Sequence, residues 1–313
     1  MSVQIDTAFV KQFSANLFHL SQQKGSRLAP AVRQESQTGE SKFFERLGSV
    51  EAREKTTRHS EVIYDDTPHS RRMVTLRDFY YSDLVDEEDK LRMLISPESP
   101  YAQAATWALG RKKDDLIISG ALGNAFGGKE GTTVIPLPLS QKIAAFDGST
   151  TTGVNLNVKT LRKVKQKFDE NDIDPSIMKY LAHTASQLQS LLGEEEITSS
   201  DYNTIQALVK GEVNSYMSFE FIMTQRLAAS ATNITYNPVS GVVGSGGGTI
   251  TAANSRRCIA WAKDGVIVST GKDVFARIQE IPEKHYAKQV YVKMCMNSTR
   301  MEEEKVVEVI CSE

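Results

Sequence analysis

The chain has 313 residues, of which 40% are hydrophobic and 24% charged, and its formal net charge is −2. This length predicts two domains, or one large domain with extensions, and a core large enough to need no metal or disulfide for folding. The near-neutral charge argues against a dedicated nucleic-acid-binding domain, which usually carries a marked basic excess.

The cysteines and the N-terminus bear on where the chain folds. Cys258, Cys295 and Cys311 are odd in number and lack Cys-x-x-Cys spacing, which is typical of reduced, mostly buried thiols in a cytoplasm. No signal peptide is evident near Met1, and no segment approaches the roughly 20 apolar residues of a membrane helix. We expect a protein made in a cytoplasm, without a membrane partner.

Residues 1–34 predict an arm. Phe9, Phe13, Leu17 and Leu20 recur at the spacing of a short amphipathic helix, and the text then turns polar and basic up to Pro30. So small a helix cannot bury both faces against its own chain. It therefore needs another surface to lie on.

Residues 35–77 predict a long two-stranded ribbon. Two β-rich runs, 35–48 and 71–77, flank a highly charged stretch between Glu51 and His69 in which apolar residues are too sparse for a core. A two-stranded ribbon is marginal alone in water. The ribbon therefore needs a neighbour, which is a ligand, another domain or another copy of the chain.

Helical patterns follow. Residues 78–94 predict an acidic amphipathic helix, marked by Leu84, Leu91 and Leu94. The pairs Ser96-Pro97 and Ser99-Pro100 are strong start signals for a second helix, which spans about residues 97–121. About 20 residues make a rod of roughly 30 Å. We interpret this helix as the mechanical spine of the molecule.

The remaining sequence predicts an α+β fold. We expect helices at about 158–171, 186–192 and 200–209, short strands at 134–139 and 219–223, and a loop at 241–248. Residues 177–258 form the more self-contained αβ region. The last part, 259–271 and 286–313, predicts strands, because its side chains alternate at period two, and residues 306–310 predict an edge-like closing strand.

Two segments resemble nucleotide-binding motifs but do not match them. Residues 123–130 almost spell a phosphate-binding P-loop, but Glu130 replaces the Ser or Thr that binds magnesium, and the segment follows a helix instead of a strand. Residues 241–248 lack the order of a dinucleotide fingerprint. Both segments predict loops, the first at the C-terminal end of a helix.

Nothing in the sequence specifies catalysis or a metal. The histidines, His19, His59, His69, His183 and His285, lack metal-ligand spacing to one another or to cysteine. No hydrolase elbow or metalloprotease signature is present. We expect no enzyme and no cofactor. The alternative of a soluble dimeric enzyme would require a pocket lined by His183, Glu194 or Asp201.

One helix carries enough positive charge to be considered for nucleic acid. Its cations are Lys159, Arg162, Lys163, Lys165 and Lys167. A solvated outer face of an amphipathic helix is the favoured interpretation. Contact with nucleic acid would be independent of base sequence and sensitive to salt.

The order of these parts resembles the major capsid proteins of tailed bacteriophages with the Hong Kong 97 fold, in particular a podophage-type subgroup. The likeness rests on runs in a fixed order: FFERLG (43–48), EKTTRH (54–59), DTPHSRR (66–72), VTLRD (74–78), DEEDKLRML (86–94), YAQ (101–103), ALGR (108–111), DD (114–115), IAWAKD (259–264), EIPEK (280–284), TR (299–300) and KVVE (305–308). It extends from about residue 5 to the end and is weakest at 120–260.

The resemblance implies an architecture and a role. It implies an N-terminal arm (1–34), an E-loop (35–77), a P-domain (78–175, with the spine helix, and 266–313) and an A-domain (176–265). It further implies self-assembly into the pentamers and hexamers of an icosahedral head around double-stranded DNA, in a virion assembled in the bacterial cytoplasm. Implied partners are a separate scaffolding protein, a portal and a cement or decoration protein.

Contacts between copies are expected along the ribbon and the spine. The residues concerned are Glu51, Arg53, Glu54, Lys55, Arg58, Arg71, Arg72, Arg77 and Arg111. Exposed ion pairs contribute roughly 0–1 kcal/mol each, but icosahedral repetition multiplies them. We expect loss of Arg71 and Arg72 to weaken assembly more than folding.

Two departures and two alternatives complete the prediction. Some family members cross-link a Lys to an Asn. Lys55 is a conceivable donor here, but no acceptor is identifiable, so no cross-link is expected. The arm is too short to hold a scaffolding domain. The alternatives are another phage structural protein, such as a decoration or head–tail ring protein, and the dimeric enzyme.

Overall fold

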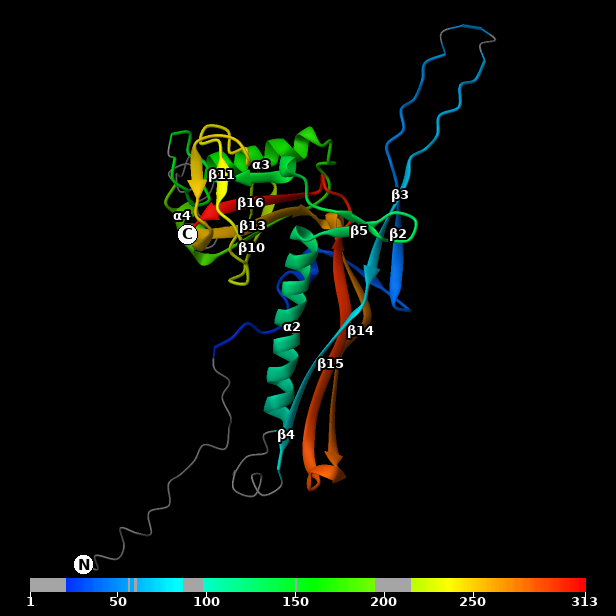
Figure 1. Cartoon of the computed structure of the whole chain (residues 1–313), viewed down its shortest axis with the longest axis vertical. Coiled ribbons are helices and arrows are strands. Elements are labelled where there is room, and N and C mark those ends of the chain that lie inside the picture. The colour runs from blue at the N-terminus through cyan, green and yellow to red at the C-terminus, as the bar shows by residue number, and fades with distance from the viewer. Residues whose placement is uncertain (1–20, 56, 59–60, 87–97, 150, 195–214) are drawn as a thin grey trace, which may run out of the picture. The chain divides into compact units, whose positions relative to one another are not determined.

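The computed structural model describes residues 21–55, 57–58, 61–86, 98–149, 151–194 and 215–313 (Figure 1). The chain divides into two compact units. Unit 1 comprises Met1–Ser26, Asp78–Lys112 and Lys272–Cys295, and unit 2 comprises Arg27–Arg77, Lys113–Gly271 and Met296–Glu313. The predicted division into arm, E-loop, P-domain and A-domain concerns roles in a shell, so it stays a prediction.

Unit 2 contains a six-stranded sheet among its described residues. In spatial order its strands are β7 (Lys142–Ala144), β16 (Val306–Ser312), β13 (Ser255–Ala262), β8 (Lys179–His183), β10 (Phe219–Met223) and β9 (Ser215–Tyr216). Every residue of β8 is buried. Strands covered on both faces need such continuous burial, and helices α3 (Val158–Glu170) and α4 (Ala185–Leu192) belong to the same unit.

Helix α3 forms where its sequence predicts it. The side chain of Asn157 accepts a hydrogen bond from the Thr160 amide and caps the N-terminus. Leu161, Val164 and Phe168 recur on one face and are fully buried in the core of the sheet. The Phe168 ring lies 5.8 Å from that of Phe219 on β10. The predictions for 158–171, 186–192 and 219–223 are confirmed.

The last strand departs from its prediction. Strand β16 pairs with β13 on one side and with β7 on the other, and residues 306–311 are all buried. It is therefore an interior strand, and the prediction of an edge-like strand was wrong. Its largely apolar sequence, interrupted by the buried Glu308, is typical of a strand covered on both faces.

Two smaller arrangements complete unit 2. An antiparallel sheet has the order β2 (Ser41–Leu47), β3 (His69–Thr75), β5 (Ala125–Gly127) and β6 (Thr133–Ile135). Strands β11 (Ile234–Tyr236) and β12 (Gly248–Ile250) form a hairpin. Strand β1 (Arg33–Ser36) pairs with residues 267–270. Leu28, Ala31 and Val32 join the main core, so the end of the predicted arm is packed within its own chain.

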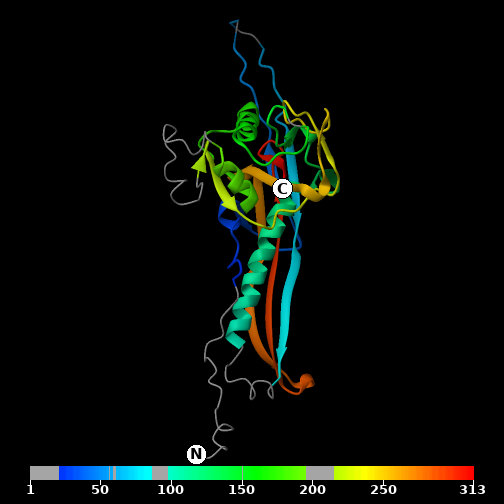
Figure 2. The ribbon, with the colours of Figure 1, turned by 90° about the vertical axis from the view of Figure 1, so that its left-hand side faces the viewer.

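Three long elements contribute to both units: helix α2 (Glu98–Leu122) and strands β14 (Val266–Ile281) and β15 (Ala287–Arg300). The spine helix predicted at about 97–121 is confirmed. In unit 1, β15 lies between β14 and β4 (Arg77–Val85). Figures 1 and 2 show α2 beside these strands. Burial of Val290, Val292 and Met294 at alternate positions marks one covered face of β15.

The prediction of a helix at 78–94 was wrong in its first half. Residues 77–85 form strand β4, because the aromatic run Phe79-Tyr80-Tyr81 favours a strand and Tyr80 stacks on Tyr291 of β15 at 6.2 Å. Residues 87–94 lie outside the described part of the chain. So do the helices predicted within residues 1–20 and at 200–209.

Candidate assembly surface

Strands β2 and β3 and the connection between them form an antiparallel ribbon. Its register places Ser41 opposite Thr75 and Leu47 opposite His69. Beyond the strands, Figure 1 shows two extended segments that run side by side. We call residues 41–75 the ribbon, strands β2 and β3 its base, and residues 49–68 its tip. The predicted ribbon of residues 35–77 is therefore present.

The ribbon tip is exposed at every residue whose burial is described. It carries large apolar side chains in that position: Val50, Val62, Ile63 and Tyr64, with exposed fractions of 66%, 73%, 65% and 90%. A cluster of exposed apolar side chains on one segment is typical of an interaction surface. The tip therefore offers apolar area that its own chain leaves uncovered.

Five of the nine residues predicted for contacts between copies lie on the tip. Arg53 forms a bidentate ion pair with Asp65 across the ribbon, at 2.6 and 2.9 Å. Glu51, Glu54, Lys55 and Arg58 are exposed. The side chains of Arg53 and Asp65 are 58% and 50% exposed, so their pair contributes little to stability.

The ribbon base is packed differently. Phe44 on β2 and Val74 on β3 form a small buried cluster with Ile267 and Met301. The amide of Leu76 donates to the Glu40 carbonyl and closes the ribbon at its inner end. Apolar residues are thus sufficient to anchor the base within its own chain, although the sequence alone predicted too few of them for any core.

A cluster of arginines fastens the base further. Arg72 is 3% exposed and donates to both carboxylate oxygens of Glu303, at 2.7 and 2.8 Å. Arg46 lies 3.7 Å from the same carboxylate and donates to the Met301 carbonyl. Together with Arg300, 3.6 Å from Glu303, these residues form what we call the arginine cluster. It ties both strands of the ribbon to the turn between β15 and β16.

Arg300 is the deepest member of the cluster. It is fully buried, and its guanidinium donates to the carbonyls of Ala121, Gly123 and Ile135 at 2.8, 2.8 and 3.0 Å. The first two carbonyls belong to the end of helix α2, where orphan acceptors and the helix dipole favour a cation. Burial lowers the pKa of Arg300, and the Glu303 carboxylate opposes that shift.

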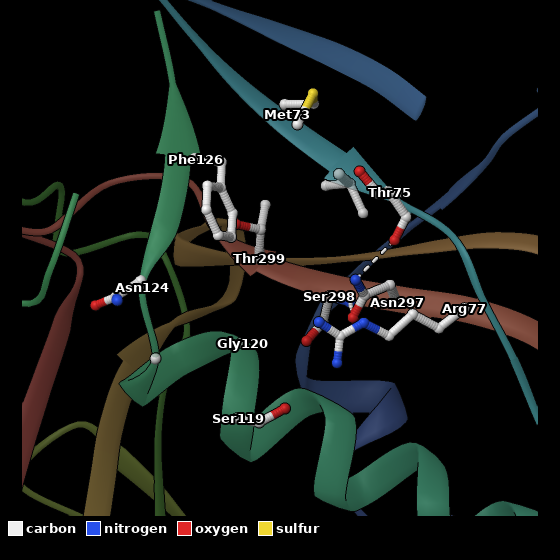
Figure 3. Close-up of a pocket in the computed structure, with 12 residues that line it drawn as sticks. Met73, Thr75, Arg77, Ser119, Gly120, Asn124, Phe126, Asn297, Ser298 and Thr299 are labelled. Carbon is white, nitrogen blue, oxygen red and sulfur yellow. Dashed lines mark hydrogen bonds between the residues drawn. The ribbon is translucent and has the colours of Figure 1, made fainter. Parts of the chain in front are cut away.

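A cavity of about 500 Å³ lies in unit 2 between β3, the end of α2, β5 and β15 (Figure 3). Asn297 donates to the Thr75 carbonyl at 2.7 Å, and the side chain of Arg77 extends toward Ser298. Gly120 is required here, because a β-carbon would collide with the hydroxyl of Ser298. The lining mixes apolar groups, such as Phe126, with hydrogen-bonding ones.

The remaining predicted contact residues are scattered. Arg71 is half-buried, pairs with Glu45 at 3.2 Å and covers the Phe43 ring. Arg77 is exposed and lines the cavity of Figure 3. Arg111, in unit 1, donates to Gln22 and to the Gln23 carbonyl.

The structure contradicts the prediction for Arg72. Because Arg72 is buried and bound to Glu303 within its own chain, it does not present its guanidinium to a neighbour as Arg53 does. Its loss is therefore expected to weaken folding, against the earlier expectation.

The lysine-rich helix α3 turns its charges outward, as predicted, and pairs part of them with acidic residues of the same helix. Lys165 pairs with Asp169 at 2.6 Å and Lys167 with Glu170 at 3.5 Å. Lys163 donates to Gln166, Lys159 to the Asp147 carbonyl, and Arg162 is exposed. A solvated outer face accounts for this arrangement without nucleic acid.

The described residues contain no group of three His, Cys, Asp or Glu side chains placed to hold a metal. His183 is buried against Phe221, and burial lowers its pKa. Glu194 is half-buried, and Asp201 lies outside the described residues. Cys258, Cys295 and Cys311 are free thiols. Burial and a hydrogen bond with Asp78 raise the pKa of the Cys295 thiol to about 11.

Sequence reasoning missed Arg46, Arg300 and Glu303. A signal for the arginines was present, since Arg46 and Arg300, like Arg72, lie within the short runs that carry the family resemblance. Glu303 lies in an acidic run, Glu302-Glu303-Glu304, that is typical of a solvated face. The burial of Glu303 depends on the folded positions of β15 and β16, which the local sequence does not indicate.

The family model of the phage capsid protein matches residues 5–313. This chain belongs to the phage capsid protein family. No curated protein matches it. The expected likeness to tailed-phage capsid proteins is thereby confirmed.

Solved capsids share the fold of this capsid protein. The capsid of the cyanophage P-SCSP1u has a TM-score of 0.72 at 12% identity, covering 97% of this chain and 93% of that one. The cyanophage Pam1 capsid gives 0.70 at 12%, covering 98% and 97%. The acid-stable capsid of the Helicobacter pylori bacteriophage KHP30 gives 0.70 at 10%, covering 100% and 98%.

These findings confirm the predicted α+β fold of the Hong Kong 97 type. The protein is a structural protein of the phage head, associates with itself in the capsid and is located in the virion. Within the described residues, no helix is both long enough and apolar enough to cross a membrane.

Proposed function

We propose that copies of this major capsid protein form the pentamers and hexamers of an icosahedral head around double-stranded DNA, and that the ribbon tip of each copy lies on a neighbouring copy. The observation that carries this proposal is the contrast within one ribbon. Its base is fixed by Phe44, Val74 and the arginine cluster, whereas its tip exposes Ile63 and Tyr64 at 65% and 90%.

A second copy of the chain is the binding partner that best fits the tip. The tip carries both signs of charge, Arg53, Lys55 and Arg58 with Glu51 and Glu54, so it suits a surface that is itself mixed in charge. A tip that binds a different surface on the next copy makes a head-to-tail contact, which closes into rings when the rotation permits. Pentamers and hexamers are such rings.

The proposed roles follow the predicted domains. Residues 1–34 act as an arm, 35–77 as the E-loop, 78–175 and 266–313 as the P-domain, and 176–265 as the A-domain. A separate scaffolding protein, a portal and a cement protein complete the proposed assembly. The protein would meet DNA without base specificity, through exposed cations such as Arg162.

We further propose that the protein catalyses no reaction and forms no cross-link. The lining of the cavity in Figure 3 supports the first point, because it holds Ser, Thr and Asn side chains and Arg77 but no acid–base pair. Lys55 is exposed and is the residue through which a covalent cross-link would form. A single monomer band from particles on a denaturing gel is the expected result.

The test replaces residues 49–67 by a short Gly-Ser turn and co-expresses the chain with the scaffolding protein of its phage. The matched control is Val239→Ser, which alters an apolar side chain that is 69% exposed but lies outside the ribbon. We expect closed shells by negative-stain microscopy from the wild type and the control, and folded but unassembled protein from the tip variant.

Shells of normal yield from the tip variant would exclude the proposed contact. A ring of fixed copy number from the wild type, with no closed shells, would favour a head–tail ring protein.

A further inference from the structure

A second cavity, of about 480 Å³, lies beside the ribbon base. It is lined by Glu45 on β2, by His69, Ser70, Arg71 and Arg72 on β3, and by Gly128, Lys129 and Ile135 from β6 and the turn that precedes it. All of these residues belong to unit 2. The cavity is distinct from that of Figure 3, which lies along the other end of β3.

The charge of this cavity is unbalanced. Three permanent cations, Arg71, Arg72 and Lys129, line it together with the single carboxylate of Glu45. Arg71 holds that carboxylate at 3.2 Å, and the Glu45 side chain is 71% exposed. Lys129 is exposed and forms no ion pair with any described residue, although Glu130 follows it in the same turn.

The excess continues behind the wall of the cavity. Arg72 is bound to Glu303, but Glu303 is shared with Arg46 and Arg300, so three guanidinium groups face one carboxylate. Arg72 is 3% exposed, and its Nε has no hydrogen-bond partner among the described residues. Because that Nε is itself shielded from solvent, Arg72 contributes its positive charge to the wall of the cavity and no open donor.

The backbone keeps space open around these donors. A β-carbon at Gly127 would lie 2.9 Å from the Arg71 carbonyl and 3.1 Å from a terminal nitrogen of Arg72. Gly128 has a φ of +85°, which side chains rarely adopt. The glycine pair therefore allows the turn that carries Lys129 to approach the guanidinium of Arg72.

We propose that this cavity is an oxyanion site that takes a carboxylate or phosphate group. Lys129 and Arg71 contact the anion directly, and the buried guanidinium of Arg72 adds positive charge behind them. Guanidinium groups suit this ligand class, because their planar donors match two oxygens at once. The anion is either an acidic side chain of a second copy or a free phosphate.

This site is not the P-loop that residues 123–130 almost spell. The segment forms β5 and a turn of an antiparallel hairpin after helix α2, with no helix behind it to cradle a nucleotide. The inference also goes beyond the proposed function, because anion binding would persist in a chain that fails to assemble.

The test measures thermal unfolding of the unassembled full-length chain with increasing inorganic phosphate, while sodium chloride keeps ionic strength constant. Lys129→Gln and Arg71→Gln are the test variants. Lys284→Gln removes the same charge from an exposed position in unit 1. At phosphate about tenfold above its Kd, we expect the melting temperature to rise roughly 2–4 °C in the wild type and Lys284→Gln.

We expect less than half of that rise in Lys129→Gln and Arg71→Gln. An equal rise in all four proteins, or no rise in the wild type, would overturn the site. Shell yield then separates the two sources. If a carboxylate of a second copy is the ligand, phosphate competes and lowers the yield of wild-type shells. If free phosphate is the ligand, yield is unchanged or higher.

Discussion

The base and the tip of the ribbon belong to one hairpin but differ in how much of their surface their own chain covers. At the base, Phe44 and Val74 pack on the chain's own β14 and β15–β16 turn, and Arg72 is buried against Glu303. At the tip, Arg53 reaches only Asp65 across the ribbon, and Tyr64 is 90% exposed. The difference teaches that one segment can be anchored in its own chain at one end and leave apolar and charged side chains exposed at the other.

Arg300→Met should have the largest effect, on the anchoring side of this comparison. It removes the donor to three carbonyls and leaves Arg46 and Arg72 alone with Glu303. Loss of one partner from a buried, hydrogen-bonded charge costs about 3–5 kcal/mol. Denaturant unfolding of the full-length chain measures it.

Arg277→Met, at an exposed position on β14, is the control and should change stability by less than about 0.5 kcal/mol. Equal effects of the two substitutions would mean that the arginine cluster does not anchor the base.

Phe44→Ala tests the apolar part of the anchor. Phe44 is 8% exposed within its cluster, so its truncation should lower the free energy of unfolding by about 3 kcal/mol. Its neighbour Phe43 points to the other face and is 36% exposed, which makes Phe43→Ala the matched control, with a loss below about 1 kcal/mol. Similar losses from both would contradict the two-faced base.

Acid should act on the core and spare the ribbon. Burial lowers the pKa of His183, whereas the unfolded chain binds a proton near the ordinary value of about 6.5. The unfolded state then binds more protons, so the free energy of unfolding falls as pH drops below about 6.5, by up to about 1.4 kcal/mol per pH unit.

His183→Gln should flatten this slope between pH 7 and 5, about the range set by the unfolded value. His69→Gln, at an exposed position of the ribbon base, should leave it unchanged. Unfolding titrations at a series of pH values compare the slopes, and an unaltered slope in His183→Gln would refute the assignment.

Arg53→Ala gives the smallest expected change in folding. Its pair with Asp65 is at least half exposed, so stability should change by about 0–1 kcal/mol. The yield of shells should fall more than this change in stability suggests, because each particle repeats the proposed contact of the tip with a neighbouring copy many times. A loss of stability comparable to that of Arg300→Met would erase the distinction between tip and base.

Local signals made much of the fold predictable. Ser99-Pro100 and the apolar text after it located helix α2, and Leu161, Val164 and Phe168 located α3. Strand β4 was not predicted, because leucines at helical spacing indicated a helix. The aromatic run Phe79-Tyr80-Tyr81 favours the strand that the structure contains. In that segment tertiary pairing with β15 outweighed local pattern.

Long-range pairing accounts for the rest. The interior place of β16 depends on partners at residues 142–144 and 255–262, which no local pattern identifies. The bond between Arg72 and Glu303 joins residues 231 positions apart. The charges of the tip were recognised from sequence, whereas the cluster that holds the base was not, because it exists only where β2, β3 and the turn after β15 meet.

The interior position of β16 has a consequence for synthesis on the ribosome. Strands β7 and β13 are made first but do not touch in the finished sheet, since the strand between them is made last. A nascent chain that has not yet released residues 306–312 therefore lacks the strand that joins β7 to the rest of the sheet. We expect a chain shortened before Val306 to leave one edge of β13 unpaired and the sheet incomplete.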